Sequence, residues 1–391
     1  MVKWSNWSGR HSANPEALAF PKGPEDAAAI VARTAQSGKS LRVAGSGHSH
    51  APLVPSNGVI VDLSGLSGVI GVNEKEKTAT VLAGTKIHAL GEPLRLAGLG
   101  LFNQGDIDRQ AIAGAVSTGT HGTGRSLKNF AAAAKSITVV LASGEVVTVS
   151  ETQQHDLWQA ARLGLGAFGL VTSLELQVRE AYRLRDKAWQ EDINPLLERT
   201  DELARSHRHF EFFWNPQSDE AFAKTIDETS DEPEYPVGEE GDRCGWSHEV
   251  FPSHRPHLHT EMEYSVPEEN GIACFREIRN LIQKDFPSLQ WPVEFRTLAA
   301  DDVWLSTAFE RPTVTLSVHQ TIKEDEEPLY RACEEVFLAH QGRPHWGKVH
   351  YLDGEQLAAA HPRWQEWWAK RDEVDPNGTF LNEHLRALHP Q

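Results

Sequence analysis

Apolar and polar positions in the first half of the chain predict short strands mixed with helices. Pro24 and the two acids after it open a segment in which apolar residues recur at helical spacing, and Gly38 ends it. Further helices are expected at 87–97 and 156–161. Strands are expected at 41–44, 59–63, 78–82, 136–141, 146–149 and 169–178. Mixed helices, strands and hairpins predict an α+β domain rather than a doubly wound parallel sheet.

The pattern changes at about residue 181, where longer charged and aromatic stretches begin. The acid-rich run 227–243 is predicted to be a solvated loop. Residues 164–169 match GxGxxG, but the motif follows a helix and opens a strand. A dinucleotide-binding turn has the opposite order, so we expect no Rossmann site there.

Two glycine-rich segments carry the chemistry of the first half. In 45–49 (Gly-Ser-Gly-His-Ser), glycines flank His48 directly after a strand, so backbone amides can approach an anionic ligand. Segment 112–124 mixes four glycines with four hydroxyl residues. We expect it to form a loop around a polyphosphate, because neither a packed helix nor a strand favours that composition. A histidine in a glycine turn is often structural, and His48 alone does not decide the function.

Three motifs follow in the second half. Glu294 and Arg296 lie two apart in a strand pattern and would share one face, as would His319 and Thr321. Lys348 closes a short run of aromatic residues and glycine after Pro344. Taken singly, these motifs fit a surface ion pair, a structural histidine and a solvated lysine.

In this order, the motifs resemble the vanillyl-alcohol-oxidase-type FAD-dependent sugar oxidases, in the branch of the alditol and aldono-1,4-lactone oxidases. The resemblance implies that family's fold. A two-part FAD-binding (PCMH-type) domain at 1–180 would precede a substrate-binding (cap) domain with an antiparallel sheet at 181–345. Residues 346–391 would return to the FAD domain.

The resemblance also implies roles for individual residues. The catalytic group would be Lys348, Arg296, Glu294 and His319, and the substrate-binding group would be Asp106, Glu294, Arg296, Thr321 and Lys348. His48 would carry FAD covalently through the 8α-methyl group of the flavin. The cofactor-binding residues would be Val43, Ala44, Gly45, Ser46, Gly47, His48, Ser49, Gly105, Asp106, Ala111, Gly114, Ser117, Thr118, Gly119, Thr120, His121 and Val171.

The expected reaction is hydride transfer from a carbohydrate carbinol, such as L-gulono- or D-arabinono-1,4-lactone, to flavin N5. Dioxygen would then be reduced to hydrogen peroxide, since Gly105 falls where the family controls oxygen access. The segment around Lys348 favours the lactone, whereas the chain length favours an alditol such as xylitol or sorbitol. Asp106 departs from the serine of the alditol oxidases and puts that substrate in doubt. The alternatives are a flavin dehydrogenase with a non-oxygen acceptor and a flavin-free carbohydrate-binding protein.

Composition and charge argue against several kinds of binding partner. The formal net charge of −17 over 391 residues argues against nucleic acid, and no apolar run is long enough to span a membrane. The polar start of the chain lacks the features of a signal peptide, which predicts a cytoplasmic location. No metal site is predicted, because the three cysteines are scattered and the histidines at 248, 254, 257 and 259 are irregularly spaced. No protein partner is implied.

Overall fold

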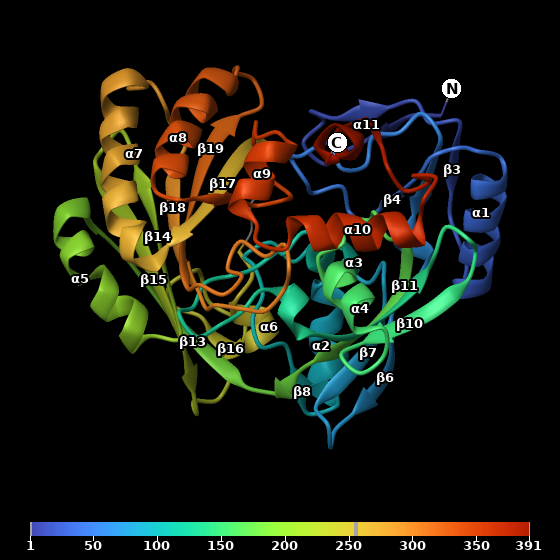
Figure 1. Cartoon of the computed structure of the whole chain (residues 1–391). Helices are drawn as coiled ribbons and strands as arrows, with labels where there is room; N and C mark the ends of the chain where they lie inside the picture. The colour runs from blue at the N-terminus through green and yellow to red at the C-terminus, as the bar shows by residue number, and fades with distance from the viewer. Residues whose placement is uncertain (1, 254–256, 391) are drawn as a thin grey trace.

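A computed structural model describes residues 2–253 and 257–390. The described chain forms two lobes (Figure 1). One lobe is built from the N-terminal half and contains a three-stranded and a five-stranded sheet, together with two two-stranded sheets. The other contains a larger antiparallel sheet with helices on its outer face.

A three-stranded parallel sheet begins the first lobe. Its strand order is β3 (Ala17–Ala19), β5 (Val59–Asp62) and β4 (Leu41–Ala44). Helix α1 (Pro24–Gln36) has proline in its first turn, followed by Glu25 and Asp26, both of which favour a helix N-terminus. The segment containing His48 leaves directly from the end of β4.

A five-stranded antiparallel sheet completes the core of this lobe. Its order is β10 (Val146–Ser150), β9 (Ala134–Val140), β11 (Leu170–Gln177), β7 (Thr78–Leu82) and β6 (Val69–Asn73). Buried and half-buried residues alternate along β11, as expected for a sheet with one face on the core. The remaining elements are α2 (His88–Leu96), α3 (Ile112–Ser117), α4 (His155–Arg162), β1 (Trp4–Ser5), β2 (Ser12–Ala13), β8 (Leu99–Gly100), β12 (Arg179–Glu180), η1 (Leu63–Gly65) and η2 (Phe130–Ala133).

The helices and strands predicted for this half are confirmed, with ends that differ by a few residues. The prediction that 112–124 is a loop throughout was wrong, because α3 occupies its first part. Ile112, Ala113, Ala115 and Val116 are buried, so packing of these apolar side chains offsets the helix-weakening effect of Gly114. The 164–169 motif follows α4 and leads into β11, the order that argued against a Rossmann site.

The second lobe is built on an eight-stranded antiparallel sheet. Its order is β16 (Cys244–Trp246), β13 (Arg183–Asp192), β15 (Glu220–Thr229), β14 (His209–Asn215), β18 (Val293–Leu298), β19 (Thr313–Thr321), β17 (His259–Pro267) and β20 (Arg343–Pro344). The helices of this lobe are α5 (Ile193–Ser206), α6 (Ser247–Val250), α7 (Gly271–Asp285), α8 (Glu327–Ala339) and η3 (Glu268–Asn270). Helices α5, α7 and α8 cover one face of the sheet, which leaves the other face for the first lobe (Figure 1).

The prediction of a solvated loop at 227–243 needs correction at both ends. Residues 227–229 belong to β15, and Arg243 is buried, with its Nε 2.7 Å from Asp186 Oδ2. The residues between them are mostly exposed. Pairing with Asp186 allows Arg243 to be buried at the end of an otherwise acidic, exposed run.

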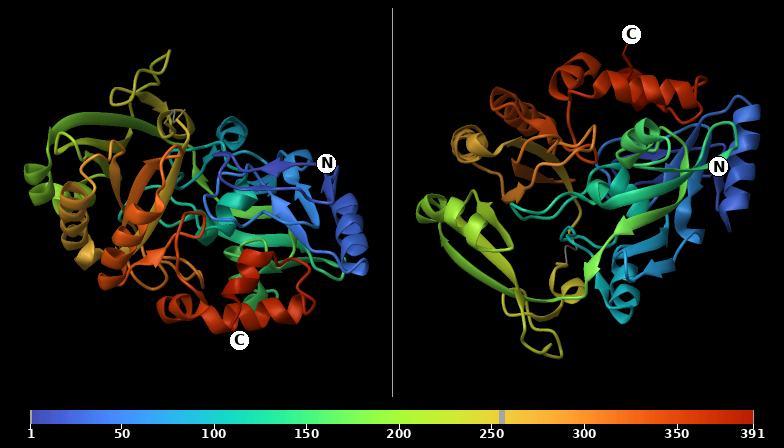
Figure 2. Two further views of the ribbon diagram at one scale, coloured as in Figure 1. Left: turned by 90° about the horizontal axis from the view of Figure 1, so that it is seen from above. Right: turned by 60° about the horizontal axis from the view of Figure 1, so that its bottom comes forward.

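The C-terminal helices lie against the first lobe in both Figures 1 and 2. They are α9 (Gly354–Ala360), α10 (Trp364–Val374) and α11 (Glu383–Leu388). Trp367 on α10 donates a hydrogen bond from Nε1 to the Leu163 carbonyl at 3.1 Å, and Leu41 N donates to the Thr379 carbonyl at 2.7 Å. We propose domain bounds at 1–180, 181–345 and 346–391. None of the described helices combines the length and the apolar character needed to cross a membrane.

Candidate active site

A cavity of about 470 Å³ is lined by residues of both lobes. The first lobe contributes the turn after β4, the segment that contains Gly105 and Asp106, and α3 with the residues after it. The second lobe contributes β17, β18, β19 and the segment that ends at Lys348. His48, Arg296 and Lys348, which are far apart in the sequence, all line this one cavity.

The turn after β4 leaves room for a ligand against the backbone. Gly47 has φ +67°, a conformation that side-chain-bearing residues rarely adopt. A Cβ added to Gly114, on α3, would meet no atom within 4 Å although that residue lines the cavity. Ser46 Oγ accepts a hydrogen bond from Lys86 Nζ at 2.6 Å and donates one to the Arg109 carbonyl at 2.7 Å. These residues fit an extended cofactor with a polyphosphate group.

His48 is held by the N-terminal segment. The Trp7 ring stacks on the His48 imidazole with a centroid separation of 5.3 Å, and Trp7 N donates to the Gly47 carbonyl at 2.8 Å. Burial, with smaller contributions in the same direction from the nearby Lys348 and Lys86, lowers the pKa of His48 to about 4. The imidazole is therefore neutral at neutral pH, the form in which a ring nitrogen can act as a nucleophile.

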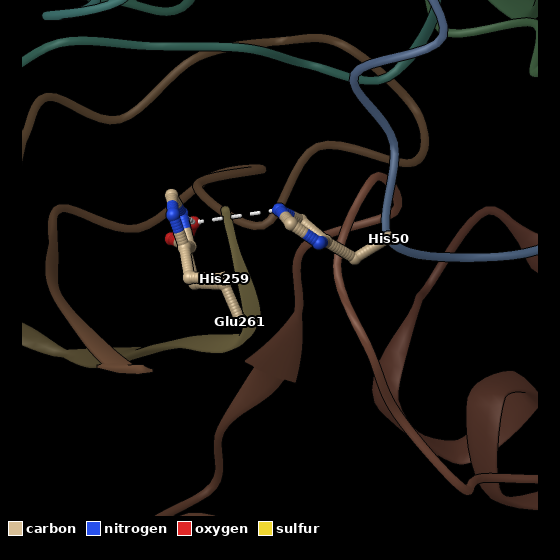
Figure 3. Close-up of side chains that lie close together, drawn as sticks. All are labelled: His50, His259 and Glu261. Atoms are coloured by element: carbon tan, nitrogen blue, oxygen red, sulfur yellow. Dashed lines mark ion pairs between the residues drawn. The ribbon is translucent and has the colours of Figure 1, made fainter. Parts of the chain in front are cut away.

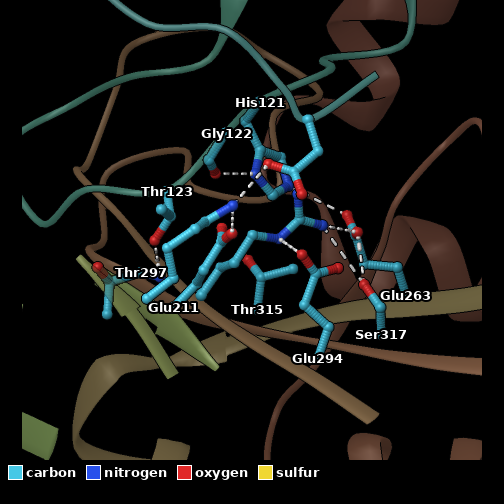
Figure 4. A network of polar contacts seen from close by, with 12 residues as sticks. His121, Gly122, Thr123, Glu211, Glu263, Glu294, Thr297, Thr315 and Ser317 are labelled. Carbon is cyan, nitrogen blue, oxygen red and sulfur yellow. Dashed lines mark hydrogen bonds and ion pairs between the residues drawn. The ribbon is translucent and has the colours of Figure 1, made fainter. Parts of the chain in front are cut away.

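Arg296 lies in a buried network of carboxylates, of which Figure 4 labels Glu263 and Glu294. Its Nη2 donates to Glu263, and its Nε lies 3.4 Å from Glu294 Oε1. Ser317 Oγ donates to Glu263 Oε2 at 2.7 Å, and His121 Nε2 lies 3.0 Å from Glu263 Oε1. Burial would raise the pKa of Glu263, but Arg296 holds it well below its ordinary value. The guanidinium is thus fixed between two carboxyl groups at the cavity wall.

A second network surrounds Glu261 on β17. Lys348 donates from Nζ to Glu261 Oε2, and the nearest ring nitrogen of each of three histidines lies at ion-pair distance from the same carboxylate. The distances are 3.7 Å for His259, 3.8 Å for His319 and 3.9 Å for His50. Figure 3 shows His50 and His259 beside Glu261. Burial alone would raise the pKa of Glu261, but Lys348 holds it well below its ordinary value.

Asp106 belongs to a third charged group, which joins the lobes. Lys224 on β15 has its Nζ 3.6 Å from Asp106, 2.6 Å from Glu211 and 3.1 Å from Glu240. Lys224 is almost fully buried, and the carboxylates around it raise its pKa although burial opposes them. Asp106 is therefore paired with a cation of the second lobe at the edge of the cavity.

Most of the residues expected in the site line the cavity, but three lie outside its lining. Ala44 is buried in β4, and Gly119 faces Leu163. Thr321 is the last residue of β19, where its Oγ1 accepts a hydrogen bond from Lys323 N at 3.3 Å. That turn removes its hydroxyl from the cavity wall, so the structure does not bring Thr321 together with Arg296 and Lys348.

The expected histidine cluster is divided in the structure. His248 lies 3.8 Å from Glu92 of α2, whereas His257 and His259 line the cavity. His254 lies outside the described residues. The described members therefore do not converge on one point, although His259 and His50 with Glu261 form a group that metal-ligand spacing allows.

Glu261, Glu263 and Lys224 also belong to these charged groups at the cavity, but they were not predicted from the sequence. A signal for the first two is present: His259, Glu261 and Glu263 are two apart on β17, and buried Met262 alternates with them. Ionisable residues on one face of an otherwise apolar strand indicate a polar cavity beside that face. Lys224 has no comparable signal, because its partners are distant in the sequence.

Comparison with known proteins identifies the family. The family model described as D-arabinono-1,4-lactone oxidase matches residues 174–244 and 237–388, and the model of an FAD-binding domain matches residues 15–150. The two matches together span both lobes. The residues at the turn after β4 and on α3 lie within the FAD-binding match.

Individual proteins agree with these models. The chain is 35% identical to an L-gulono-1,4-lactone dehydrogenase of Mycobacterium tuberculosis over 98% of each chain, and 29% identical to an alditol oxidase of a Streptomyces species over 98% of each. A structure of B. sterolicum cholesterol oxidase superimposes with a TM-score of 0.84 at 16% identity, over 99% of this chain and 96% of that one. That likeness shows the expected fold, a PCMH-type FAD-binding domain with an antiparallel cap. The chain belongs to the D-arabinono-1,4-lactone oxidase family and is an FAD-dependent sugar oxidoreductase.

Proposed function

We propose that the protein oxidises a carbinol of an aldono-1,4-lactone, such as L-gulono- or D-arabinono-1,4-lactone. The observation that carries this proposal is the placement of Arg296 and Lys348 on the same cavity as the flavin-binding turn. When bound, FAD would accept the hydride that leaves the substrate carbon. The M. tuberculosis relative is named for a lactone substrate, and the matching family model is too, which favours a lactone over an alditol.

The two cations would stabilise the reacting oxygen. As the carbinol loses its proton, negative charge develops on that oxygen, and fixed cationic donors lower the energy of this state. The carboxylates that hold Arg296 and Lys348 fix their direction before substrate enters. His319 would support this arrangement from the adjacent strand, with its Nδ1 2.9 Å from the Pro292 carbonyl. Asp106 would accept a hydrogen bond from a more distant substrate hydroxyl.

Glu294 is the carboxyl best suited to take up the proton. Burial raises the pKa of Glu294 to about 8 against the opposing effect of Arg296, and the nearby Glu211, Asp106 and Glu261 add to the rise. A base with a pKa near the working pH combines a useful unprotonated fraction with proton affinity. Glu261 cannot fill this role, because its pKa is held well below its ordinary value.

This assignment predicts a pH dependence. Since a general base works only when unprotonated, kcat/KM should rise with pH and level off above about 8. The measurement is initial rates from pH 6 to 10 for the wild type and for Glu294→Gln, with thermal unfolding to confirm folding. The variant should lose the rise and about 10²-fold or more in rate. If kcat/KM of the variant rises with pH as it does in the wild type, the base is another group.

We infer that His48 binds the flavin covalently. A neutral imidazole, stacked on Trp7 and beside the cofactor turn, supports this assignment. In the wild type, yellow colour should stay with acid-precipitated protein, and in His48→Ala it should move to the supernatant. His88→Ala, which changes a histidine outside the cavity lining, is the control and should behave like the wild type. Flavin that remains with precipitated His48→Ala protein would contradict the attachment.

We propose dioxygen as the electron acceptor, with hydrogen peroxide as the product. Gly105 lines the cavity at the position where the resemblance places control of oxygen access. A second candidate is favoured by the name of the M. tuberculosis relative, a dehydrogenase, whose electrons would go to a non-oxygen acceptor. Oxygen consumption with substrate alone supports the oxidase. Turnover that needs an added dye or quinone supports the dehydrogenase.

The substrate is tested with purified protein and four compounds. L-gulono-1,4-lactone, D-arabinono-1,4-lactone, xylitol and sorbitol are compared by flavin bleaching without oxygen, which does not depend on the acceptor. Either lactone should have a higher kcat/KM than either polyol. A preference for the polyols would replace the proposed substrate with an alditol, and no bleaching by any of the four would reject both classes.

A further inference from the structure

Glu261 is the buried carboxylate at which the greatest number of cavity-lining groups meet. Its side chain is 5% exposed. It comes from β17, which lies between β19 and β20 in the sheet. Lys348 contacts Oε2, which also faces His50 and His259, while His319 faces Oε1. None of the four groups comes from β17 except His259. One carboxylate thus connects the turn after β4, two strands and the lysine segment.

A metal ion is the first alternative for this group, because His50, His259 and Glu261 have ligand atoms close enough to share one. However, the ammonium of Lys348 already contacts the oxygen toward which both imidazoles point. A divalent cation there would have to displace or neutralise that ammonium, since like charges at this distance repel strongly. The contacts therefore favour an ammonium site over a metal site.

Two of the three histidines around Glu261, His319 and His50, do not compete with Lys348 for its charge. Burial lowers the pKa of His319 to about 4 and that of His50 well below its ordinary value, so both are neutral at neutral pH. Lys348 is then the main cationic partner of the carboxylate. The imidazoles enclose the pair, and water is kept from most of its surface.

We propose that Glu261 is a positioning residue. Its carboxylate, which three imidazoles surround, holds the Lys348 ammonium in the direction of the reacting oxygen of the substrate. The inference rests on the proposed function of Lys348. Glu261 itself touches neither substrate nor flavin in this role. It restricts the lysine to one direction, so that the donor is in place before charge develops.

A double-mutant cycle tests the coupling. Glu261→Gln keeps the shape of the side chain but removes the charge that holds Lys348, and kcat should fall about 10²-fold while KM changes much less. In a Lys348→Met background the same change should cost less than about threefold, since there is no ammonium left to position. Rates are measured by flavin reduction with the lactone in single turnovers, so that slow variants remain measurable.

Matched variants separate positioning from folding. Glu334→Gln changes another buried glutamate, which accepts hydrogen bonds from Tyr264 Oη and from Tyr351 N at 2.8 Å and does not line the cavity. It should lower the midpoint of thermal unfolding without lowering kcat. Glu261→Asp keeps the charge and should recover part of the lost rate. If Glu261→Gln does not fold, Glu261→Asp takes its place in the cycle, where the shortened side chain should still show smaller losses without Lys348.

Three results would overturn the inference. One is an equal loss from the Glu261 substitution with and without Lys348, which would show a merely structural role. Another is an unchanged kcat in Glu261→Gln. The third is a stoichiometric metal ion in purified wild-type protein that is lost with Glu261→Gln. Failure of the proposed function gives a different result, because the wild type itself would then not be reduced by any lactone.

Discussion

Replacing Lys348 with methionine is expected to lower kcat about 10²–10³-fold while the protein stays folded and yellow. The substitution keeps an unbranched side chain one atom shorter than lysine and removes the ammonium that would face the reacting oxygen. A single donor to a developing oxyanion contributes about 2.7–4 kcal/mol to the transition state, which corresponds to this loss of rate. The measurement is the rate of flavin reduction by L-gulono-1,4-lactone, together with the visible spectrum of the purified variant.

Lys370→Met is the matched control. Lys370 also pairs with a glutamate, and its side chain is 21% exposed against 20% for Lys348, but it lies on α10 outside the cavity lining. Its removal should leave kcat within about twofold of the wild type, because an exposed ion pair contributes about 1 kcal/mol or less to stability. A Lys348→Met enzyme with near-normal turnover would remove Lys348 from the mechanism.

The second large effect is expected for Arg296→Lys. Lysine keeps the positive charge but cannot contact Glu263 and Glu294 together as a planar guanidinium does. With one buried carboxylate left without its partner, the donor moves from its position and kcat/KM should fall about 10²-fold. The same steady-state and bleaching assays measure the loss, and thermal unfolding measures the cost in stability.

Arg162→Lys provides the comparison for this substitution. Arg162 is as deeply buried as Arg296 and pairs with Asp302 at 3.1 Å, yet it lies on α4 away from the cavity lining. Both variants should unfold at lower temperature than the wild type, because in each a buried guanidinium loses its contacts with carboxylates. Only Arg296→Lys should lose activity beyond its loss of folded protein. Equal activities for the two variants would mean that Arg296 is structural.

The sequence was sufficient for the fold and for a set of motif residues that the structure places on one cavity. Local spacing shows that Glu294 and Arg296 share a face, because successive side chains of a strand such as β18 point to opposite faces. The glycine turn at His48 was recognisable for the same reason, since its conformation is decided by neighbours in the sequence.

Contacts between distant segments could not be derived in this way. Lys224 meets Asp106 across 118 positions of the sequence, through a pairing of lobes that no local pattern encodes. Thr321 differs from Lys224, because a correct strand prediction placed it beside His319 but could not show that the strand ends there and that Thr321 lies outside the cavity lining. Segment 112–124 was misjudged because burial by α4 and η2 outweighs the weak helix preference of its residues.

The return of the C-terminal residues to the first lobe bears on how the enzyme is made. Arg42 on β4 donates to the carbonyls of Leu53, Leu165 and Phe380, so the support of the flavin turn draws on residues from both ends of the chain. While the ribosome is still synthesising the protein, the nascent first lobe lacks this last partner. Stable loading with FAD is therefore expected to follow synthesis of the segment that contains Phe380.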